Sequence, residues 1–306
     1  MESFAKRVTE KVYRFGPLVV GLDPHFDALP PFLLRRFLPQ EMSLEGLAEA
    51  IFVFGAELLE ALSGEVGCIK IQLAFYEALG IPGMRALSET LRLAKDRGFL
   101  VILDGKRNDI ASSAILYAQG YLSGIKLGNV VLSPFWNADA LTVNPYFGED
   151  GLRPFFTEAY QSGKGIFVLA RTSNPSAPFL QDEGCSIRVF EKVASLVDTL
   201  RGEFPEDSPV SSFGLVVGAT YPNDLKRLRK SFPNLLFLIP GIGAQGGSLE
   251  TVRLAFLPGG LGALIAVSRD ILFAYREKGR KEGEDFAERA LERVREYRRI
   301  LQSIVP

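Results

Sequence analysis

Residues 103–109, with the sequence LDGKRND, place two carboxylates and an ammonium group close together in the chain. They follow residues 99–103, an apolar run that is typical of a buried strand. Side chains alternate along a strand, so Asp104 and Lys106 are predicted to project to the same side. An ammonium group fixed beside carboxylates can stabilise negative charge that develops on a bound molecule. The alternative to a catalytic role is a structural one, in which Asp104 lies in a turn and Asp109 caps the next helix.

Polar side chains also end other apolar runs of the sequence. These ends carry Asp23, then Lys70 and Gln72, then Thr142 and Asn144. Taken singly, each is more often a turn residue or a solvated strand end. Together with Asp104 and Lys106, they put polar groups at four neighbouring strand ends. Polar groups at four successive strand ends are improbable if these ends only need to be solvated, so the set favours a shared site.

The arrangement of the chain as a whole predicts an α/β fold. Short apolar runs cover residues 18–22, 66–71, 99–103, 140–143, 166–170, 213–217, 235–239 and 263–267. Segments with helical periodicity lie between or after them, at residues 43–62, 82–97, 186–201, 248–257 and 284–304. Parallel neighbours need a crossover connection, so this alternation predicts a single (β/α)8 TIM barrel over residues 1–306.

Three further segments complete this prediction of the fold. Residues 2–15 have an apolar face and end at Gly16 and Pro17, which predicts an N-terminal helix that caps the bottom of the barrel. Residues 202–212 are polar and are expected to form a surface loop. Residues 120–137 are expected to be an elaboration of the third crossover.

Composition excludes several classes of partner. Lys and Arg total 35 against 36 Asp and Glu, so the net charge of -1 gives no long-range field that would collect nucleic acid or an anionic membrane. No apolar run approaches the roughly 20 residues needed to span a bilayer, and the first residues resemble no targeting peptide. The two cysteines, Cys68 and Cys185, cannot make a disulfide framework, so a cytoplasmic location is expected.

The last two apolar runs are followed by segments suited to an anion. Residues 240–248 read PGIGAQGGS and residues 268–270 read SRD. Glycines let backbone N–H groups approach an anion closely, and Arg269 supplies a forked donor. In barrels of this kind the chemistry sits at the carboxyl ends of the strands, and the loops after strands seven and eight commonly hold phosphate. These segments therefore predict a phosphate site that includes Pro240 and Gly243.

The motif LDGKRNDI resembles the D-x-K-x-x-D-I signature of the orotidine 5'-phosphate decarboxylase family. IKIQLAFYE resembles the second-strand lysine segment of that family's longer bacterial branch. GLDP, TVNPYFGEDGLRPF, RTSNPSA, PGIGAQGG and SRDI also resemble that branch, in the same order. The resemblance runs from about Gly21 to Ile271. The signature alone is shared with sugar-phosphate relatives, whereas the set as a whole is highly specific.

This resemblance implies decarboxylation of orotidine 5'-phosphate to UMP, in the synthesis of pyrimidines. Lys106 would protonate C6 of the pyrimidine after carbon dioxide leaves, with Asp104 beside the departing carboxylate and Lys70 completing the charge network. Asp109 would reach across the interface of a homodimer to touch the ribose in the partner's site. The further substrate contacts would come from Asp23 at a ribose hydroxyl, Ser173 at the pyrimidine edge, Gln245 between base and phosphate, Arg269 at the phosphate, and Asn144, Pro240 and Gly243.

Such a reaction agrees with the residue types found. Loss of carbon dioxide from C6 leaves a vinyl carbanion that the ring delocalises poorly. The sequence contains no thiamine, pyridoxal or metal motif that could accept the electrons, so no cofactor and no metal ion are expected. An ammonium group beside the developing anion stabilises it more than it stabilises the starting carboxylate. Binding energy from a distant phosphate offsets the crowding of charge at the reacting end.

The sequence also departs from the family pattern and leaves alternatives open. Three residues occupy positions where the family commonly has glycine. They are Asn108, Ala111 and Asp270, the last of which follows Arg269. A magnesium-dependent sugar-phosphate decarboxylase or aldolase would share the signature, but would want a carboxylate at the position of Lys70. A Schiff-base aldolase would need a lysine of depressed pKa, which neighbouring carboxylates oppose. A non-catalytic nucleotide-binding barrel would need the phosphate and ribose contacts but not Lys106.

Overall fold

The structure is a computed structural model that describes residues 2–38, 42–184, 186–242, 249–279 and 282–306. Within these residues, eight parallel strands close into a barrel in the order β1-β10-β9-β8-β7-β6-β3-β2. The strands are β1 (Leu18–Leu22), β2 (Cys68–Gln72), β3 (Leu100–Arg107), β6 (Ala140–Val143), β7 (Gly165–Arg171), β8 (Phe213–Val217), β9 (Leu236–Ile239) and β10 (Ala263–Val267). The predicted (β/α)8 barrel is confirmed.

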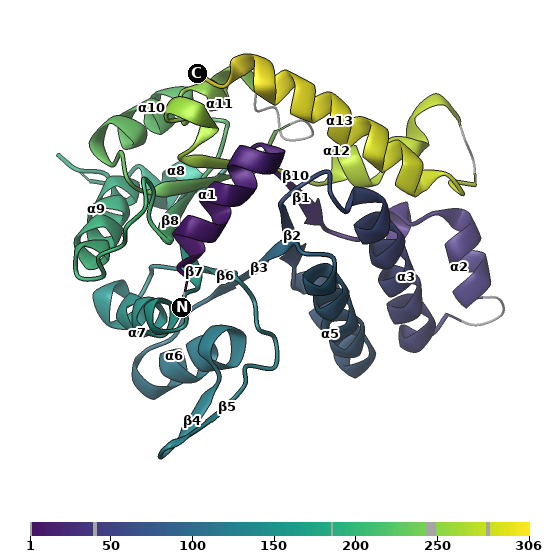
Figure 1. The fold of residues 1–306 in the computed structure, drawn as a ribbon, viewed down its shortest axis with the longest axis horizontal. Coiled ribbons are helices and arrows are strands. Elements are labelled where there is room, and N and C mark those ends of the chain that lie inside the picture. The colour runs from purple at the N-terminus through teal and green to yellow at the C-terminus, as the bar shows by residue number, and fades with distance from the viewer. Residues whose placement is uncertain (1, 39–41, 185, 243–248, 280–281) are drawn as a thin grey trace.

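Helices surround the strands on the outside of the barrel (Figure 1). The longer ones are α1 (Phe4–Phe15), α3 (Leu44–Leu62), α5 (Gly80–Asp96), α6 (Ala111–Ala118), α7 (Gly148–Gln161), α9 (Val189–Gly202), α10 (Pro222–Ser231) and α13 (Phe286–Ile304). Short helices are α2 (Pro31–Phe37), α4 (Ala74–Glu77), α8 (Ala177–Gln181), α11 (Leu249–Arg253) and α12 (Arg269–Leu272). The predicted helices at 2–15, 43–62, 82–97 and 284–304 agree with α1, α3, α5 and α13 to within about two residues, the usual uncertainty of helix ends.

Three sequence predictions about segments have different outcomes. Residues 203–212 form the expected loop before β8. Residues 120–137 do elaborate the third crossover: a π-helical turn, η2 (Gln119–Ser123), leads into an antiparallel hairpin of β4 (Ile125–Leu127) and β5 (Val130–Leu132). The strand predicted at residues 99–103 is longer in the structure, where β3 runs from Leu100 through polar residues to Arg107.

Helix α1 closes one end of the barrel, and Figure 1 shows it lying across the strands. Its N-cap residue is Ser3, whose hydroxyl accepts a hydrogen bond from the Lys6 N–H at 3.2 Å. Phe4 and Val8 are fully buried and pack with residues that point into the barrel. Phe4 fits because β7 starts at Gly165, where a Cβ atom would lie 2.4 Å from the phenyl ring. The predicted capping helix is therefore confirmed.

A buried carboxylate ties this closed end together. Asp139 is fully buried and accepts hydrogen bonds from the Val101 N–H at 2.9 Å and from Arg7 of α1 at 2.5 Å. Lys95 of α5 donates to both of its oxygens at 2.8 Å. Burial raises the pKa of Asp139, but the charges of Lys95 and Lys164 outweigh this effect and hold the pKa below its ordinary value. One carboxylate thus joins α1, α5 and two strands.

Two further observations complete the description. Cys68 is buried in β2, and Cys185 lies outside the described residues. Among the residues that the structure describes, no helix combines the length and the apolar character needed to cross a membrane.

We expect Asp139→Asn to lower the free energy of unfolding by about 2–4 kcal/mol, because Arg7, Lys95 and Lys164, whose side chains are only 11–30% exposed, lose their counter-charge. Since the folded pKa of Asp139 is lowered, its contribution is present above the ordinary value of 3.8 and is lost as the pH falls through the folded value. Urea unfolding between pH 7 and pH 3 measures this. The control is Asp96→Asn, which removes an exposed carboxylate on α5; equal losses for both variants would contradict the prediction.

Candidate active site

A cavity of about 460 Å³ opens at the carboxyl ends of the barrel strands. Side chains or backbone at the end of every strand contribute to its lining. The lining includes the polar or charged side chains of Asp23, Lys70, Gln72, Asp104, Lys106, Thr142, Thr172, Ser173, Asn174 and Arg269, together with Pro240 and Gly241. This end of the barrel is where ligands bind in proteins of this architecture. The cavity is therefore the candidate active site.

Four charged side chains form an alternating chain across the floor of this cavity. Lys70 Nζ lies 3.2 Å from Asp23 Oδ1 and 3.1 Å from Asp104 Oδ2. Lys106 Nζ lies 2.7 Å from the other Asp104 oxygen. The two central side chains are the most buried, with exposed fractions of 7% for Lys70 and 12% for Asp104, against 19% for Asp23 and 45% for Lys106 at the ends. The sequence predicted that these side chains converge, and the structure brings all four together.

The environment fixes the charge state of the two most buried groups. Burial by itself lowers the pKa of Lys70, but the Asp23 and Asp104 carboxylates outweigh it and raise the pKa above its ordinary value. Burial by itself raises the pKa of Asp104, but Lys70 and Lys106 outweigh it and hold the pKa well below its usual range. Both groups are therefore charged at neutral pH.

Neutral donors hold the Asp104 carboxylate in place. The Thr142 hydroxyl donates to Oδ1 at 2.9 Å, and the Gln72 amide donates to Oδ2 at 3.1 Å. With the two ammonium groups, each carboxylate oxygen has two partners. Thr142 stood among the polar strand ends of the sequence, but its role as the residue that orients Asp104 could not be read there, because that role depends on the pairing of β6 with β3.

Strand β3 departs from regular geometry where it carries Lys106. The register between β3 and β6 shifts between Leu103 and Arg107, and Lys106 has a φ of 48°, in the left-handed region that residues with a Cβ rarely adopt. The Lys106 N–H donates to Thr142 Oγ1 at 3.0 Å. Asp104 and Lys106 do share one side, as predicted, but through a strained bulge rather than through simple alternation.

The opposite wall of the cavity has the groups expected of an anion site. Pro240 and Gly241 follow β9, and Arg269 begins α12 after β10. Gly243 and Gln245, which were also predicted to contact the ligand, lie outside the described residues. The carboxylate of Asp270 is bound by Tyr297 at 2.6 Å and by Arg293 at 3.0 Å, both on α13. This departure from the family pattern is therefore neutralised by α13.

Three other predicted residues have distinct positions. Ser173 lines the cavity from the loop after β7. Asn144 is not among the lining residues of the described chain; its side chain accepts a hydrogen bond from the Tyr146 N–H at 3.0 Å, in a turn after β6. Asp109 also lies outside the lining, on the loop before α6, and accepts from the Ile110 N–H at 2.8 Å. Ile110 occupies the N-cap position of α6, so the alternative that Asp109 caps this helix is wrong.

The donor set does not match a metal site in the part of the chain that the structure describes. No three His, Cys, Asp or Glu side chains gather there to hold an ion. Asp23 and Asp104, the two carboxylates of the cavity, are separated by Lys70, which pairs with both. An ammonium group thus occupies the place between them.

Fold and cavity together define an α/β-barrel protein with a charged ligand site at the carboxyl ends of its strands. The chain belongs to the orotidine 5'-phosphate decarboxylase / HUMPS family, whose sequence pattern matches residues 17–282. The chain is similar to the orotidine 5'-phosphate decarboxylase of Rhodopirellula baltica, with 41% identity over 91% of both chains. It is 40% identical to that of Deinococcus radiodurans, over 89% of this chain and 90% of the other.

Solved structures agree with this assignment. A putative orotidine-monophosphate-decarboxylase from Toxoplasma gondii superposes with a TM-score of 0.77 and 32% identity, over 99% of each chain. A putative orotidine 5'-phosphate decarboxylase from Streptomyces avermitilis has the same TM-score at 31% identity, over 100% of this chain and 96% of the other. The predicted family is confirmed.

We expect Lys70→Met to lower the free energy of unfolding by about 2–4 kcal/mol, because it leaves two partly buried carboxylates facing each other. Lys106→Met also removes a cation from Asp104, but from a half-exposed position, so its expected effect is less than about 1 kcal/mol. Urea unfolding of both variants at pH 7 measures the difference. Similar values for the two would contradict the alternating chain described above.

Proposed function

We propose that this protein is a carboxy-lyase that converts orotidine 5'-phosphate to UMP without a cofactor, as the names of its relatives suggest. The observation that carries the proposal is the chain Asp23–Lys70–Asp104–Lys106 on the floor of the cavity. It offers a fixed carboxylate and a fixed ammonium group side by side. This pair suits a reaction in which a negative charge moves from a carboxylate onto a ring carbon.

In the proposed reaction the bond between C6 and the carboxylate carbon breaks, and its electron pair stays on C6. Lys106 then transfers one proton from Nζ to C6 and regains a proton from solvent, to which its side chain is half exposed. The ammonium group interacts more strongly with the carbanion at C6 than with the starting carboxylate, whose charge lies farther out. Asp104 disfavours the starting state, because a substrate carboxylate placed beside it meets a like charge.

Preorganisation supports this role for Asp104. Thr142, Gln72 and Lys70 hold its oxygens before any substrate arrives. The carboxylate therefore cannot swing away to relieve repulsion. Fixed charges that need no rearrangement during the reaction are the largest source of catalysis in many enzymes.

The remaining cavity residues are proposed to bind the nucleotide. Asp23 is assigned a ribose hydroxyl, Ser173 the edge of the pyrimidine, and Arg269 the phosphate. No residue that the structure describes pairs with the Arg269 guanidinium, so this group is available to an anion. Gln245, Gly243, Pro240 and Asn144 stay predicted contacts of the same nucleotide.

Two alternatives make different demands on these residues. The magnesium-dependent sugar-phosphate enzymes would need a carboxylate where β2 carries Lys70, and the donor set described above argues against a metal there. A non-catalytic nucleotide-binding barrel would not need Lys106 beside Asp104, so nothing in its function would require the strained backbone at Lys106.

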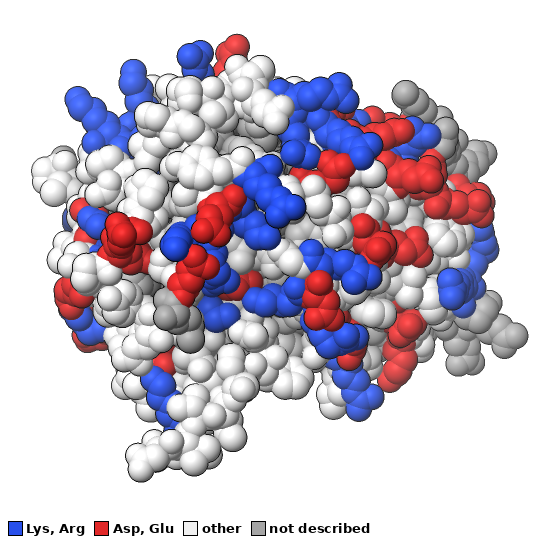
Figure 2. Space-filling view, in the orientation of Figure 1, with Lys and Arg blue, Asp and Glu red and all other residues white. Residues whose placement is uncertain are grey.

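We also propose that two copies associate through an uncharged surface next to the cavity. Between residues 110 and 147, only Lys126 and Asp139 are charged. The β4–β5 hairpin projects from the molecule in Figure 1 and is nearly uncharged in Figure 2. The exposed large apolar side chains here include Leu116, Ile125, Leu127, Val130, Val131 and Leu132, whose exposed fractions are 41–61%. Such a surface is typical of an interface.

The position of Asp109 supports a second copy as the partner. Asp109 begins this surface and lies directly after the strand that carries Lys106, yet it does not line the cavity of its own chain. A homodimer with two-fold symmetry would let each Asp109 reach the other chain's site. The same arrangement would cover the exposed hairpin.

We expect Lys106→Ala to reduce kcat at least roughly a thousandfold, because it removes both the stabilising charge and the proton donor. UMP affinity should fall far less. The assay follows loss of the orotate ultraviolet band in the presence of a chelator, with UMP binding measured by calorimetry. Lys226→Ala, which changes an exposed lysine on α10, is the control.

The same assay on the wild-type protein separates the alternatives. Turnover that requires added magnesium would support the sugar-phosphate enzyme, and UMP binding without any turnover would support the non-catalytic nucleotide-binding barrel.

We expect subunit mixing to test the role of Asp109. Lys106→Ala and Asp109→Ala chains should each be inactive, but co-expression should restore roughly a quarter of wild-type activity, since half of the dimers are mixed and one of their two sites is intact. Co-expression of Lys106→Ala with Lys70→Ala is the control, because these residues belong to one chain's site and should not complement. No recovery in the first mixture would overturn the shared site.

A further inference from the structure

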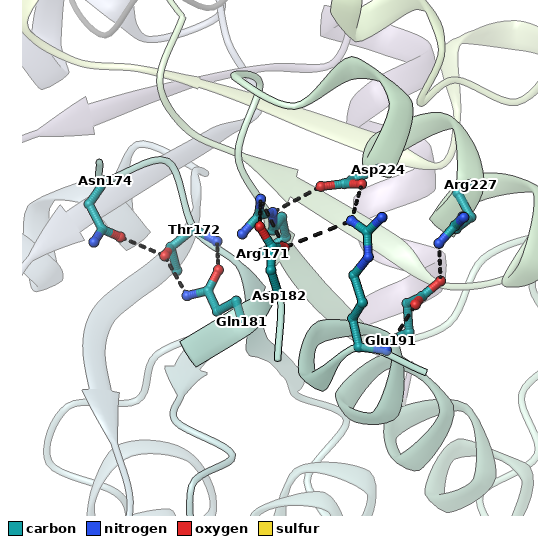
Figure 3. A network of polar contacts seen from close by, with 9 residues as sticks. Arg171, Thr172, Asn174, Gln181, Asp182, Glu191, Asp224 and Arg227 are labelled. Carbon is teal, nitrogen blue, oxygen red and sulfur yellow. Dashed lines mark hydrogen bonds and ion pairs between the residues drawn. The ribbon is translucent and has the colours of Figure 1, made fainter. Parts of the chain in front are cut away.

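The loop after β7 forms one wall of the cavity and is held from behind by α8. Thr172 and Asn174 of this loop line the cavity, and Gln181 is the last residue of α8. Figure 3 shows Thr172 between the other two side chains. The Thr172 N–H donates to Gln181 Oε1 at 2.9 Å, and Gln181 Nε2 donates to Thr172 Oγ1 at 2.7 Å. The Thr172 hydroxyl donates to Asn174 Oδ1 at 2.6 Å. We call these three residues the relay.

One backbone group fixes the orientation of the Gln181 amide and thereby favours one orientation of Asn174. A backbone N–H can only donate, so the atom of Gln181 that faces it is the amide oxygen. The NH₂ group of Gln181 therefore faces Thr172 Oγ1. The hydroxyl has a single proton, and within the relay this proton has an acceptor only if the facing atom of Asn174 is its oxygen, which is the orientation in the structure. The NH₂ group of Asn174 is left to point away from Thr172.

This NH₂ group is a donor at the rim of the cavity. Asn174 lines the cavity, and no residue that the structure describes accepts a hydrogen bond from its Nδ2. Ser173, the next residue along the chain, lines the same wall. The wall that is proposed to contact the pyrimidine edge therefore carries a second polar side chain, Asn174, whose amide is oriented before a ligand binds.

Ion pairs fix the base of the loop that carries the relay. Arg171 directly precedes Thr172, and Asp182 directly follows Gln181, and these two form an ion pair at 3.2 Å. Arg171 is 1% exposed and also donates to Asp224 of α10 at 3.0 Å (Figure 3). Two adjacent pairs, 171–182 and 172–181, therefore close the same loop. Supporting contacts of this kind hold a site residue in one geometry.

We propose that Gln181 and Thr172 are positioning residues that present the Asn174 amide as a donor to a carbonyl oxygen of a pyrimidine base. The identity of the ligand rests on the proposed function. The ring carbonyl oxygens of a pyrimidine such as uracil only accept hydrogen bonds, so a donor at this rim matches them and an acceptor does not. A site that leaves such an oxygen facing another acceptor binds more weakly.

The polarity of the relay can be reversed with a nearly isosteric change. In Gln181→Glu both carboxylate oxygens accept, one from the Thr172 N–H and the other from the Thr172 hydroxyl. Thr172 Oγ1 must then accept from Asn174, whose amide turns over and presents its oxygen to the ligand. We expect the Kd for UMP, measured by calorimetry, to rise about tenfold or more. KM for orotidine 5'-phosphate should rise with it, while kcat changes less than about threefold, because this contact is remote from C6.

A double-mutant cycle separates this role from a structural one. Asn174→Ala should weaken UMP binding by itself, and Gln181→Glu should have no further effect in that background. Thr172→Ser, which keeps the hydroxyl, should retain UMP affinity, whereas Thr172→Val should lose it. Unchanged UMP affinity in Gln181→Glu, or the same loss with and without Asn174, overturns the proposal.

Binding and turnover report separately on the relay and on the proposed function. A wild-type protein that binds UMP but shows no turnover contradicts the proposed function, and the relay is then judged on Kd alone. A wild-type protein that does not bind UMP overturns both.

Discussion

Asp104 lies within β3, between the ammonium groups of Lys70 and Lys106, and Thr142 and Gln72 donate the other two hydrogen bonds to its two oxygens. Its partners keep it charged despite burial, and they keep it from moving. The rest of the cavity is built on this constraint. A carboxylate that stays charged at neutral pH and is held in place is a fixed source of repulsion for a second carboxylate, and the ammonium group beside it is a fixed source of attraction for a carbanion.

Placing these charges side by side requires an irregular strand. Lys106 takes a left-handed backbone conformation and β3 shifts register against β6 at this point. Conformations of this kind cost of order 1–3 kcal/mol and persist where surrounding contacts fix them. Here the Thr142 hydroxyl accepts from the Lys106 N–H and donates to Asp104, so one side chain both supports the strain and orients the carboxylate.

The two ends of the barrel use the same electrostatic arrangement for different purposes. Asp139, at the end closed by α1, is fully buried among Arg7, Lys95 and Lys164. Asp104, at the opposite end, is surrounded by a comparable number of donors but opens onto a space large enough for a nucleotide-sized ligand. Both carboxylates have a lowered pKa. The difference lies in what adjoins them, which is helix α1 in one case and the cavity in the other.

The sequence by itself determined the barrel, its capping helix and the convergence of Asp23, Lys70, Asp104 and Lys106. It could do so because buried strands and amphipathic helices follow from local periodicity, and parallel strands bring their carboxyl ends to one side. Only the tertiary structure decided the bulge at Lys106, the role of Thr142, and the pairing of Asp270 with α13, because each depends on which residue of a distant element lies opposite. The polarity of Asn174 has the same origin. It is set by contacts between a loop and the end of a helix, and no local pattern encodes that contact.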